Sequence, residues 1–406
     1  MTDDISPRGT EQSHIDVPGD LSIAAAKSSG RSFGLLVVAL LVLAGGAVYF
    51  VGAVLSAGDE VADAQARAEE KIELFDPADF TSEFSANDET PSSLPLIDDE
   101  PTLDEAANRD TTITTTAAPA PTIDPSQIAL AFINRVPGDE YGLVGYIDPQ
   151  GQRHITELEC SRLDLNENGG ICLSSTAGLG GTGRGTLIDA SLEPSLRFGV
   201  NEPSRAAVSP DGSVVAWTGF SLGHSYLNAG EFATTTQLVS VDRSVGVNLE
   251  EVFKTYRDDV LVDAFERNYW GVTFVDSDLF YATLGLGEET SIVEGRVSNS
   301  RIDIVFDNAT CPEVSPDGAT IVAKERRGDF FQLIAIDVVS GTRRDLGETR
   351  SVEDQVEWAD EDTILYALPN LEEGTAGQPV FDVYALDVAP GSEPRLLVPF
   401  ADSPAA

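Results

Sequence analysis

One short stretch of the chain occurs twice, and this repeat constrains the fold more than any other feature. Val314-Ser-Pro-Asp-Gly318 is followed by Ala-Thr-Ile-Val-Ala323, and Val208-Ser-Pro-Asp-Gly212 is followed by Ser-Val-Val-Ala-Trp217. In each copy, Pro presets the first dihedral of a turn, Gly permits a positive φ, and β-branched residues follow, so each copy predicts one β-hairpin. A hairpin unit that recurs along a chain is typical of a β-propeller, whose blades are repeated antiparallel sheets.

Short apolar strands continue from residue 128 to the end of the chain. Five nearly complete four-strand units and a partial N-terminal group predict six blades, with the first strands closing the ring against the last. Such closure removes exposed sheet edges. The fold prediction is therefore all-β, a six-bladed β-propeller over residues 128–406. The insert from Phe253 to Trp270 is expected to be a loop or short helix on one rim, where long inserts tend to carry function.

The N-terminal part reads differently. Residues 1–32 are polar without apolar periodicity, which is typical of a disordered tail. Residues 33–55 are uncharged and long enough to cross a hydrocarbon core of ~30 Å as a single transmembrane helix. A cleaved signal peptide is the alternative, but the apolar run is longer than usual for one and no clean cleavage site follows it. We therefore expect a membrane anchor.

Charges on the two sides of the expected span predict its orientation. Lys27 and Arg31 precede it, whereas Asp59 and Glu60 follow it, so the positive-inside rule places the N-terminus in the cytoplasm and the propeller outside. Residues 56–127 are predicted to connect the two: a juxtamembrane helix over residues 59–75, then a disordered, acidic stalk rich in Pro and Thr. The expected location is thus the cell membrane, with an extracytoplasmic propeller.

Composition limits the partners and the chemistry. The formal net charge of -43 and a pI near 4.1 would repel phosphate backbones, so nucleic acid is not an expected partner. The chain has three histidines and three cysteines. Cys160 and Cys172 flank a predicted strand, Asn-Gly turn and strand, so they could form a disulfide across one hairpin, with two buried thiols as the alternative. Cys311 is left over and is interpreted as a buried free thiol.

Three short motifs are weighed and set aside. Gly219-Phe-Ser-Leu-Gly223 matches a hydrolase nucleophile elbow, but the single histidine after Ser221 is His224, too close in sequence to serve as the base of a triad. Asp164 to Gly169 matches the start of a calcium loop, but Ser175 stands where the bidentate Glu is needed, so a hairpin turn is favoured over weak calcium binding. Gly178 to Gly183 fits a dinucleotide pattern without a following helix. We expect no cofactor, no metal site and no enzymatic activity.

The repeats also carry a family resemblance. The Ser-Pro-Asp-Gly turns with Leu333-Ile-Ala-Ile-Asp-Val-Val-Ser-Gly341 resemble the repeats of TolB-type β-propellers. As a set, six further motifs resemble actinobacterial membrane-anchored TolB-like translocation proteins: Cys160 with Gly170-Ile-Cys172-Leu, Pro203-Ser-Arg205, Gly223-His-Ser-Tyr226, Trp270-Gly-Val-Thr-Phe274, Phe280-Tyr-Ala-Thr283 and Asp354-Gln-Val-Glu-Trp358. The resemblance covers about residues 140–406. It implies a six-bladed extracytoplasmic propeller and does not imply an activity.

Aromatic and arginine side chains near two long inserts are the candidate binding residues: His224, Tyr226, Arg257, Tyr269 and Trp270. For Tyr269 and Trp270, packing between blades is the competing interpretation. The predicted function is a protein-binding or scaffolding module of the cell envelope, held on the membrane by one helix and contacting an envelope protein. The alternative is a glycan-binding or hydrolytic propeller that uses the mouth of its channel. The oligomeric state stays open.

Overall fold

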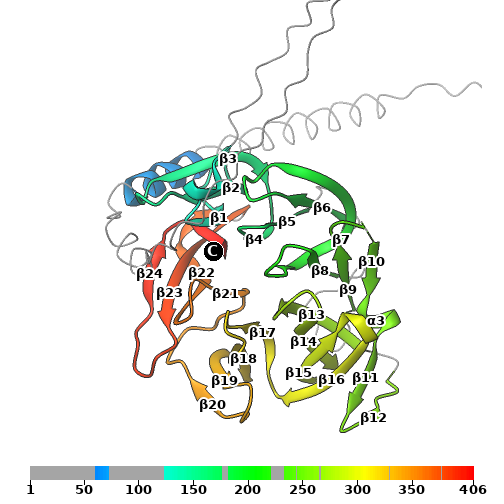
Figure 1. Ribbon diagram of the computed structural model, residues 1–406. Helices are drawn as coiled ribbons and strands as arrows, with labels where there is room; N and C mark the ends of the chain where they lie inside the picture. Colours follow the sequence, from blue (N-terminus) through cyan, green and yellow to red (C-terminus); the bar gives the residue numbers. More distant parts are fainter. Residues whose placement is uncertain are drawn as a thin grey trace, which may run out of the picture. The chain divides into compact units, whose positions relative to one another are not determined.

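The structure is a computed structural model of the chain (Figure 1). It describes residues 60–72, 123–175, 182–220, 233–243, 245–264, 267–328, 330–375 and 377–406. The chain divides into two compact units, residues 1–58 and 59–406, and all described residues belong to the second. The predicted tail, the predicted span 33–55 and most of the predicted stalk lie outside the described residues. Within the described ranges, no helix combines the length and the apolar character needed to cross a membrane.

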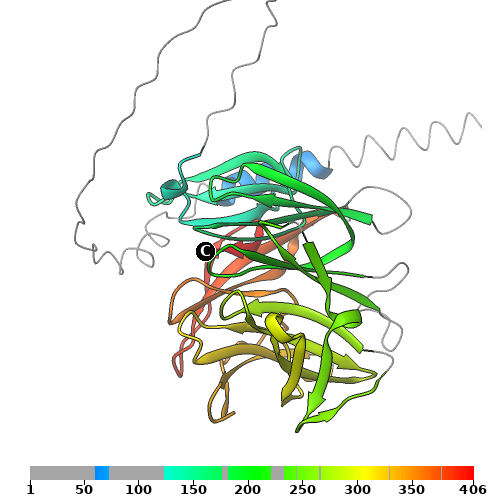
Figure 2. The ribbon, with the colours of Figure 1, turned by 45° about the vertical axis from the view of Figure 1, so that its right-hand side comes forward.

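Antiparallel sheets stand around a common centre, as expected for a β-propeller (Figures 1 and 2). The first sheet has the order β25-β1-β2-β3, with β1 (Leu130–Asn134), β2 (Leu143–Ile147), β3 (Arg153–Glu159) and β25 (Ala401–Ala405). A short 3-10 turn, η2 (Pro125–Gln127), precedes β1. The second sheet runs from β4 to β10: β4 (Arg162–Asn166), β5 (Gly169–Ser175), β6 (Thr182–Ile188), β7 (Pro194–Val208), β8 (Val214–Phe220), β9 (Thr234–Ser240) and β10 (Val245–Asn248).

Three more sheets complete the described part of the ring. The third has the order β12-β11-β16-β15-β14-β13, with β11 (Lys254–Arg257), β12 (Val260–Leu261), β13 (Arg267–Phe274), β14 (Leu279–Leu286), β15 (Glu289–Arg296) and β16 (Arg301–Asp307). The fourth contains β17 (Thr310–Val314), β18 (Thr320–Arg327), β19 (Phe330–Asp337) and β20 (Arg343–Asp345), and the fifth contains β21 (Val356–Trp358), β22 (Thr363–Thr375), β23 (Gln378–Asp387) and β24 (Arg395–Val398). The helical turns α3 (Leu249–Val252) and η3 (Val297–Asn299) connect strands.

The repeated Ser-Pro-Asp-Gly turns form the predicted hairpins. In each, the serine hydroxyl donates to the aspartate: Ser209 Oγ lies 2.7 Å from Asp211 Oδ1, and Ser315 Oγ lies 2.6 Å from Asp317 Oδ1. Gly212 and Gly318 have φ values of 68° and 72°, a region that favours glycine. The turns join β7 to β8 and β17 to β18, whose strands pair in antiparallel register.

The described residues form five sheets, whereas six separate blades were predicted. The difference lies in β7, which pairs with β6 as far as Asn201 and with β8 from Glu202 onward. No turn interrupts β7, so two predicted four-strand units are joined into one seven-stranded sheet. The register shifts between Pro203 and Arg205, as expected where proline cannot donate a ladder hydrogen bond.

The insert after Val252 also differs from the prediction of a loop or short helix. Residues of this insert form β11 and β12, and β11 pairs in parallel with β16. The β-branched and aromatic residues of the insert have high strand propensity, and the open edge of β16 offers them a partner. The third sheet is therefore wider than an ordinary four-stranded blade.

Apolar side chains fill the spaces between neighbouring sheets. One cluster joins Ala216 and Leu238 of the second sheet to Phe280 and Val293 of the third. Comparable clusters lie between the fourth and fifth sheets and between the fifth and first. The ring closes as predicted, because the last strand, β25, pairs with the first, β1. Residues 60–72, part of the segment 59–75 that was predicted to be a juxtamembrane helix, are helical and pack on the propeller.

Candidate functional site

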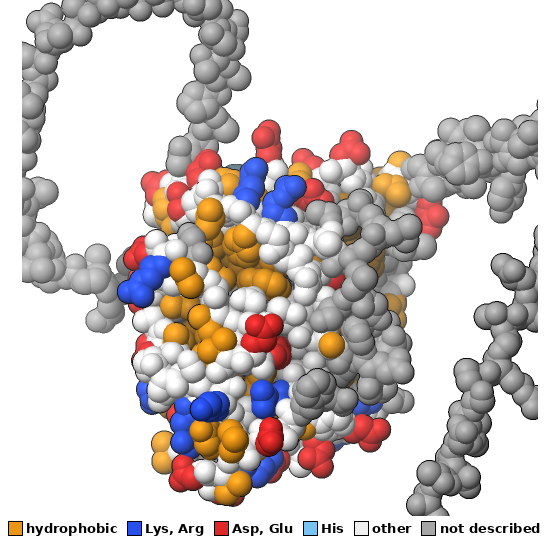
Figure 3. Space-filling model, turned by 90° about the vertical axis from the view of Figure 1, so that its right-hand side faces the viewer, with side chains coloured by type: hydrophobic (Ala, Val, Ile, Leu, Met, Phe, Trp, Pro, Cys, Tyr) orange, Lys and Arg blue, Asp and Glu red, His pale blue; other side chains and the backbone are white. Residues whose placement is uncertain are grey.

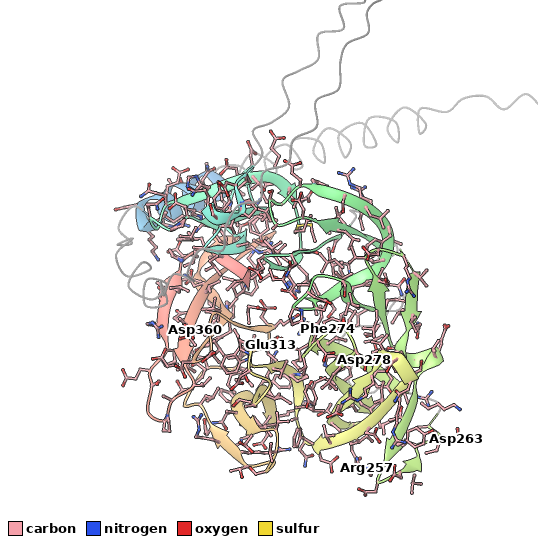
Figure 4. The ribbon with its side chains drawn as sticks, in the orientation of Figure 1. Arg257, Asp263, Phe274, Asp278, Glu313 and Asp360 are labelled. Atoms are coloured by element: carbon pink, nitrogen blue, oxygen red, sulfur yellow. A yellow bond between two sulfur atoms is a disulfide. The ribbon has the colours of Figure 1, made fainter. Side chains whose placement is uncertain are left out.

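The structure separates the five predicted binding residues. His224 and Tyr226 lie outside the described residues. Arg257 lies at the outer end of β11, far from the centre of the ring (Figure 4). It donates two hydrogen bonds to Asp307, of 3.0 Å and 2.8 Å. Because both partners are about half exposed, this ion pair contributes little to stability and leaves Arg257 accessible.

Tyr269 and Trp270 lie inside the fold, so the interpretation as a contact surface does not describe them. Both belong to β13 and are 0% and 5% exposed. The Tyr269 hydroxyl is within hydrogen-bonding distance of Thr255 Oγ1, and Trp270 Nε1 donates to Thr310 Oγ1 over 3.1 Å. Trp270 thus connects the third sheet to β17 of the fourth. The competing interpretation, packing between blades, describes these two side chains.

Exposed apolar side chains lie on the elements near Arg257, which pairs with Val260. The side of the molecule that carries β10 and α3 shows apolar patches between charged side chains (Figure 3). Its exposed apolar residues are Val245, Val252, Val260 and Leu261. The acidic side chains of Glu251, Asp258 and Asp263 are exposed on the same segments.

The predicted disulfide is present between Cys160 and Cys172, whose Cα atoms are 5.5 Å apart. Cys160 follows β3 of the first sheet, and Cys172 belongs to β5 of the second. The bond therefore links two neighbouring sheets rather than the two arms of the β4–β5 hairpin. Cys311 is free and buried, as predicted.

A group of carboxylates that the sequence interpretation missed lies at the centre of the ring. Asp164 comes from β4, Glu313 from β17 and Glu357 from β21, three strands at the ends of three different sheets. Figure 4 shows Glu313 near the centre of the ring. Asp164 Oδ2 accepts the backbone N–H of Val208 at 2.7 Å, and Glu313 Oε1 accepts the hydroxyl of Thr273 at 2.7 Å. We call Asp164, Glu313 and Glu357 the axial carboxylates.

Each axial carboxylate has a raised pKa. Burial raises the pKa of Asp164 to about 6, although the N–H of Val208 opposes the shift. Burial, with the Asp164 carboxylate, raises the pKa of Glu313 well above its ordinary value. Burial and the carboxylates of Asp164 and Glu313 do the same to Glu357. Like charges held together out of water favour protonation or a bound cation.

A layer of cationic side chains lies beside the axial carboxylates. Lys324 is 2% exposed, and its Nζ donates to the carbonyl oxygen of Glu353 at 2.8 Å and to that of Asp354. Arg205 also donates to the carbonyl oxygen of Glu353, at 3.0 Å, and Gln355 Nε2 donates to the carbonyl oxygen of Ala206 at 2.9 Å. Residues 353–355 are therefore tied to the second and fourth sheets. These contacts join three sheets across the middle of the ring.

Charges in this layer shift the groups around them. Burial acts to raise the pKa of Asp354, but Arg162, Arg205 and Lys324 hold it below its ordinary value. Burial also acts to raise the pKa of Cys311, and Lys324 and Arg205 outweigh it. The groups that shift the pKa of the axial carboxylates are burial, hydrogen bonds and other acids, with no lysine or arginine among them. Cations therefore lower the pKa of groups in one layer, whereas burial and neighbouring acids raise it in the other.

Asp402 of β25 extends the charged centre toward the first sheet. Its Oδ2 lies 2.9 Å from Arg135 Nε, while its buried Oδ1 has no hydrogen-bond partner among the described residues. Burial raises the pKa of Asp402 to about 6, with Arg135 opposing the shift.

No group of three or more His, Cys, Asp and Glu side chains in the described ranges is arranged to hold a metal ion.

A sequence signal for these acids exists in retrospect. Each axial carboxylate stands between two apolar residues directly before a turn, as in Leu163-Asp164-Leu165, Pro312-Glu313-Val314 and Val356-Glu357-Trp358. A lone acid in a buried inner strand is costly unless it is hydrogen-bonded or protonated. The pattern indicates that each acid is unusual. It does not predict that the three acids lie close together, because that depends on the closed ring.

Strand pairing and ring closure define the chain as a β-propeller protein. Comparison with known protein families and with curated proteins finds no match. Among solved structures, TolB from Agrobacterium tumefaciens is similar, with 12% sequence identity, a TM-score of 0.43, and coverage of 67% of this chain and 89% of that one. TolB from Acinetobacter baumannii has 12% identity and a TM-score of 0.32, covering 65% and 78%. The propeller domain of the Trilobed protease from Pyrococcus furiosus has 13% identity and a TM-score of 0.32, covering 58% and 72%. These similarities are too distant to bear on function.

Proposed function

We propose that this chain is a membrane-anchored, extracytoplasmic binding module of the cell envelope, akin to the TolB-like proteins that its motifs resemble, and that it has no catalytic activity. The proposed anchor is the apolar segment 33–55, with the N-terminus in the cytoplasm. The proposed partner is an envelope protein, which offers a cationic side chain or amine to the axial carboxylates.

The observation that carries this proposal is the convergence of Asp164, Glu313 and Glu357 from three sheets. Burial and mutual repulsion make three ionised carboxylates unfavourable together. An ammonium or guanidinium group would relieve that repulsion and accept charge-assisted hydrogen bonds, the strongest polar contacts available to it. A rigid ring holds the three acids in place without a partner, so little ordering is needed on binding.

The test is capture of a partner by the full-length chain in crosslinked envelopes. A variant with Asp164→Asn, Glu313→Gln and Glu357→Gln removes the axial charges at nearly constant volume. The matched control, Glu251→Gln with Asp258→Asn and Asp263→Asn, removes three exposed charges. We expect the native chain and the control to retain the same protein, and the axial variant to lose it. Equal capture by all three would rule out the axial carboxylates as the binding site.

The raised pKa values favour one second candidate. A carboxylic acid that stays protonated near neutral pH is the general acid that glycosidases require, beside a second carboxylate. A hydrolytic propeller would use Glu313 or Glu357 in this role. Turnover of glycan substrates by the native chain, abolished by Glu313→Gln or Glu357→Gln alone, would replace the binding proposal with the hydrolytic one.

A further inference from the structure

The helical segment 60–72 buries small residues against the propeller. Ala64 and Ala68 are 1% and 0% exposed. Ala68 packs with Val380 of β23 and with Phe400, while Ile72 and Val136 lie at the edge of the same cluster. Small side chains let a helix approach a sheet closely, so this face of the helix is suited to docking.

Ion pairs hold the same segment to β22. Arg67 Nε lies 3.2 Å and Lys71 Nζ 2.7 Å from the Glu373 carboxylate, whose side chain is only 8% exposed. Both cations face one acid, four residues apart along one face of the helix. A partly buried acid with two partners is more specific than an ordinary surface pair, because loss of either side leaves a charge poorly solvated.

The contacted residues lie on both sides of the seam where the ring closes. Val380 and Glu373 belong to the fifth sheet, whereas Phe400 and Val136 adjoin β25 and β1 of the first. Phe400 also accepts the backbone N–H of Arg135 at 2.8 Å. At Gly138, an added Cβ would come within 2.5 Å of Gln65 Oε1, so the loop after β1 fits closely around the helix. The segment thus crosses the seam.

We propose that helix 60–72 is a strap that stabilises the closed ring by holding the fifth and first sheets together at the closing seam.

The strap is tested by charge reversal in the full-length chain, with amide hydrogen exchange of residues 60–72 as the readout. Glu373→Lys places like charges together, and we expect protection of this segment to fall by roughly tenfold or more. Arg67→Glu with Lys71→Glu should do the same, while all three substitutions together should restore protection. The control, Asp387→Lys, breaks the exposed Arg395 pair in the same sheet and should leave the segment unchanged. Unchanged protection in Glu373→Lys, or no recovery in the triple variant, would overturn the strap.

Discussion

At the scale of single residues, the centre of the ring contains two kinds of buried charged group: cations that bind backbone oxygens, and carboxylates with raised pKa values. Lys324 satisfies two backbone carbonyl oxygens of the segment that crosses the middle, so its charge fixes structure. Asp164 accepts a hydrogen bond from Val208 of its own sheet, and Glu313 accepts one from Thr273 of the neighbouring third sheet. Their pKa values stay raised, because burial, and for Glu313 also the charge of Asp164, outweighs those bonds. The cationic layer therefore holds the sheets together. The axial carboxylates are unfavourable in their ionised form, and a bound cation or proton would stabilise them.

The raised pKa values of buried carboxyl groups predict that the propeller is more stable in mild acid than at neutral pH. Folding raises the pKa of Asp164 and Asp402 to about 6 and that of Glu250 to about 7. A raised pKa adds stability that is complete below the unfolded value and lost as pH rises through the folded value. The free energy of unfolding should therefore fall by about 2 kcal/mol or more between pH 5 and pH 7.5, since one pKa unit corresponds to about 1.4 kcal/mol.

Urea unfolding of the full-length chain in neutral detergent at pH 5, 6, 7 and 8 measures this slope. Carboxylates with lowered pKa, such as Asp317 and Glu373, lose their contribution only as pH falls below about 4, outside this window. Asp164→Asn should make the slope less steep, because Asp402 and Glu250 still contribute to it. The control, Asp263→Asn, changes an exposed residue at the periphery (Figure 4) and should keep it. A native chain with stability that is constant or rising toward pH 7.5 would contradict the prediction.

The candidate site could be predicted only in part, for a physical reason that these residues show. Arg257 was placed on an exposed insert correctly, because charge and insertion are local properties. Tyr269 and Trp270 look alike in sequence whether they pack between sheets or face a partner, and their burial depends on β17 and on Thr255. The axial carboxylates come from strands about 150 residues apart in the chain, from Asp164 to Glu313. No local pattern states that such residues meet.

At the scale of elements, turns were predictable and edges were not. Pro and Gly fix turn dihedrals by their own covalent structure, so Ser209 to Gly212 and Ser315 to Gly318 form hairpins wherever the chain folds. In contrast, β11 and β12 exist because β16 leaves an open edge for them, and β7 continues through two ladders because neighbours are present on both of its halves. Whether such segments form strands depends on their neighbours in the tertiary structure and not on the local sequence alone.

The Cys160–Cys172 disulfide gives a prediction at this scale. It links the end of β3 to β5 with a sequence separation of 12, and closing a loop of this size lowers the entropy of the unfolded chain by an amount worth about 3 kcal/mol. Cys160→Ser with Cys172→Ser should reduce the free energy of unfolding by about that amount. A reductant should destabilise the native chain to the same level and leave the double variant unaffected. Full stability of the double variant would show that packing alone joins the two sheets.

At the scale of the whole molecule, the last strand decides whether the ring is closed. Every residue of β25 is buried. It pairs with β1 on one side, and on the other, Ser403 Oγ bonds to both backbone groups of Leu163, accepting its N–H at 3.0 Å and donating to its carbonyl oxygen at 3.1 Å. The sequence predicted closure because a ring removes two sheet edges. It could not predict that one serine would connect the first sheet to the second.

Removal of residues 401–406 should therefore open the ring, whereas removal of the exposed Ala406 alone should not. Without β25, β1 presents an unpaired edge, Leu163 loses its partners, and Arg135 loses Asp402. An open edge of this kind promotes association between chains. We expect the shortened chain to lose its cooperative thermal transition and to elute as aggregates in size-exclusion chromatography.

Ser403→Ala separates the contribution of the β25–β1 pairing from that of the Ser403 hydrogen bonds. It keeps β25 in place and leaves the Leu163 N–H without its acceptor, at a cost of about 1–3 kcal/mol. A monomeric, cooperatively melting chain without residues 401–406 would mean that the remaining sheets and the strap hold the ring without its last strand.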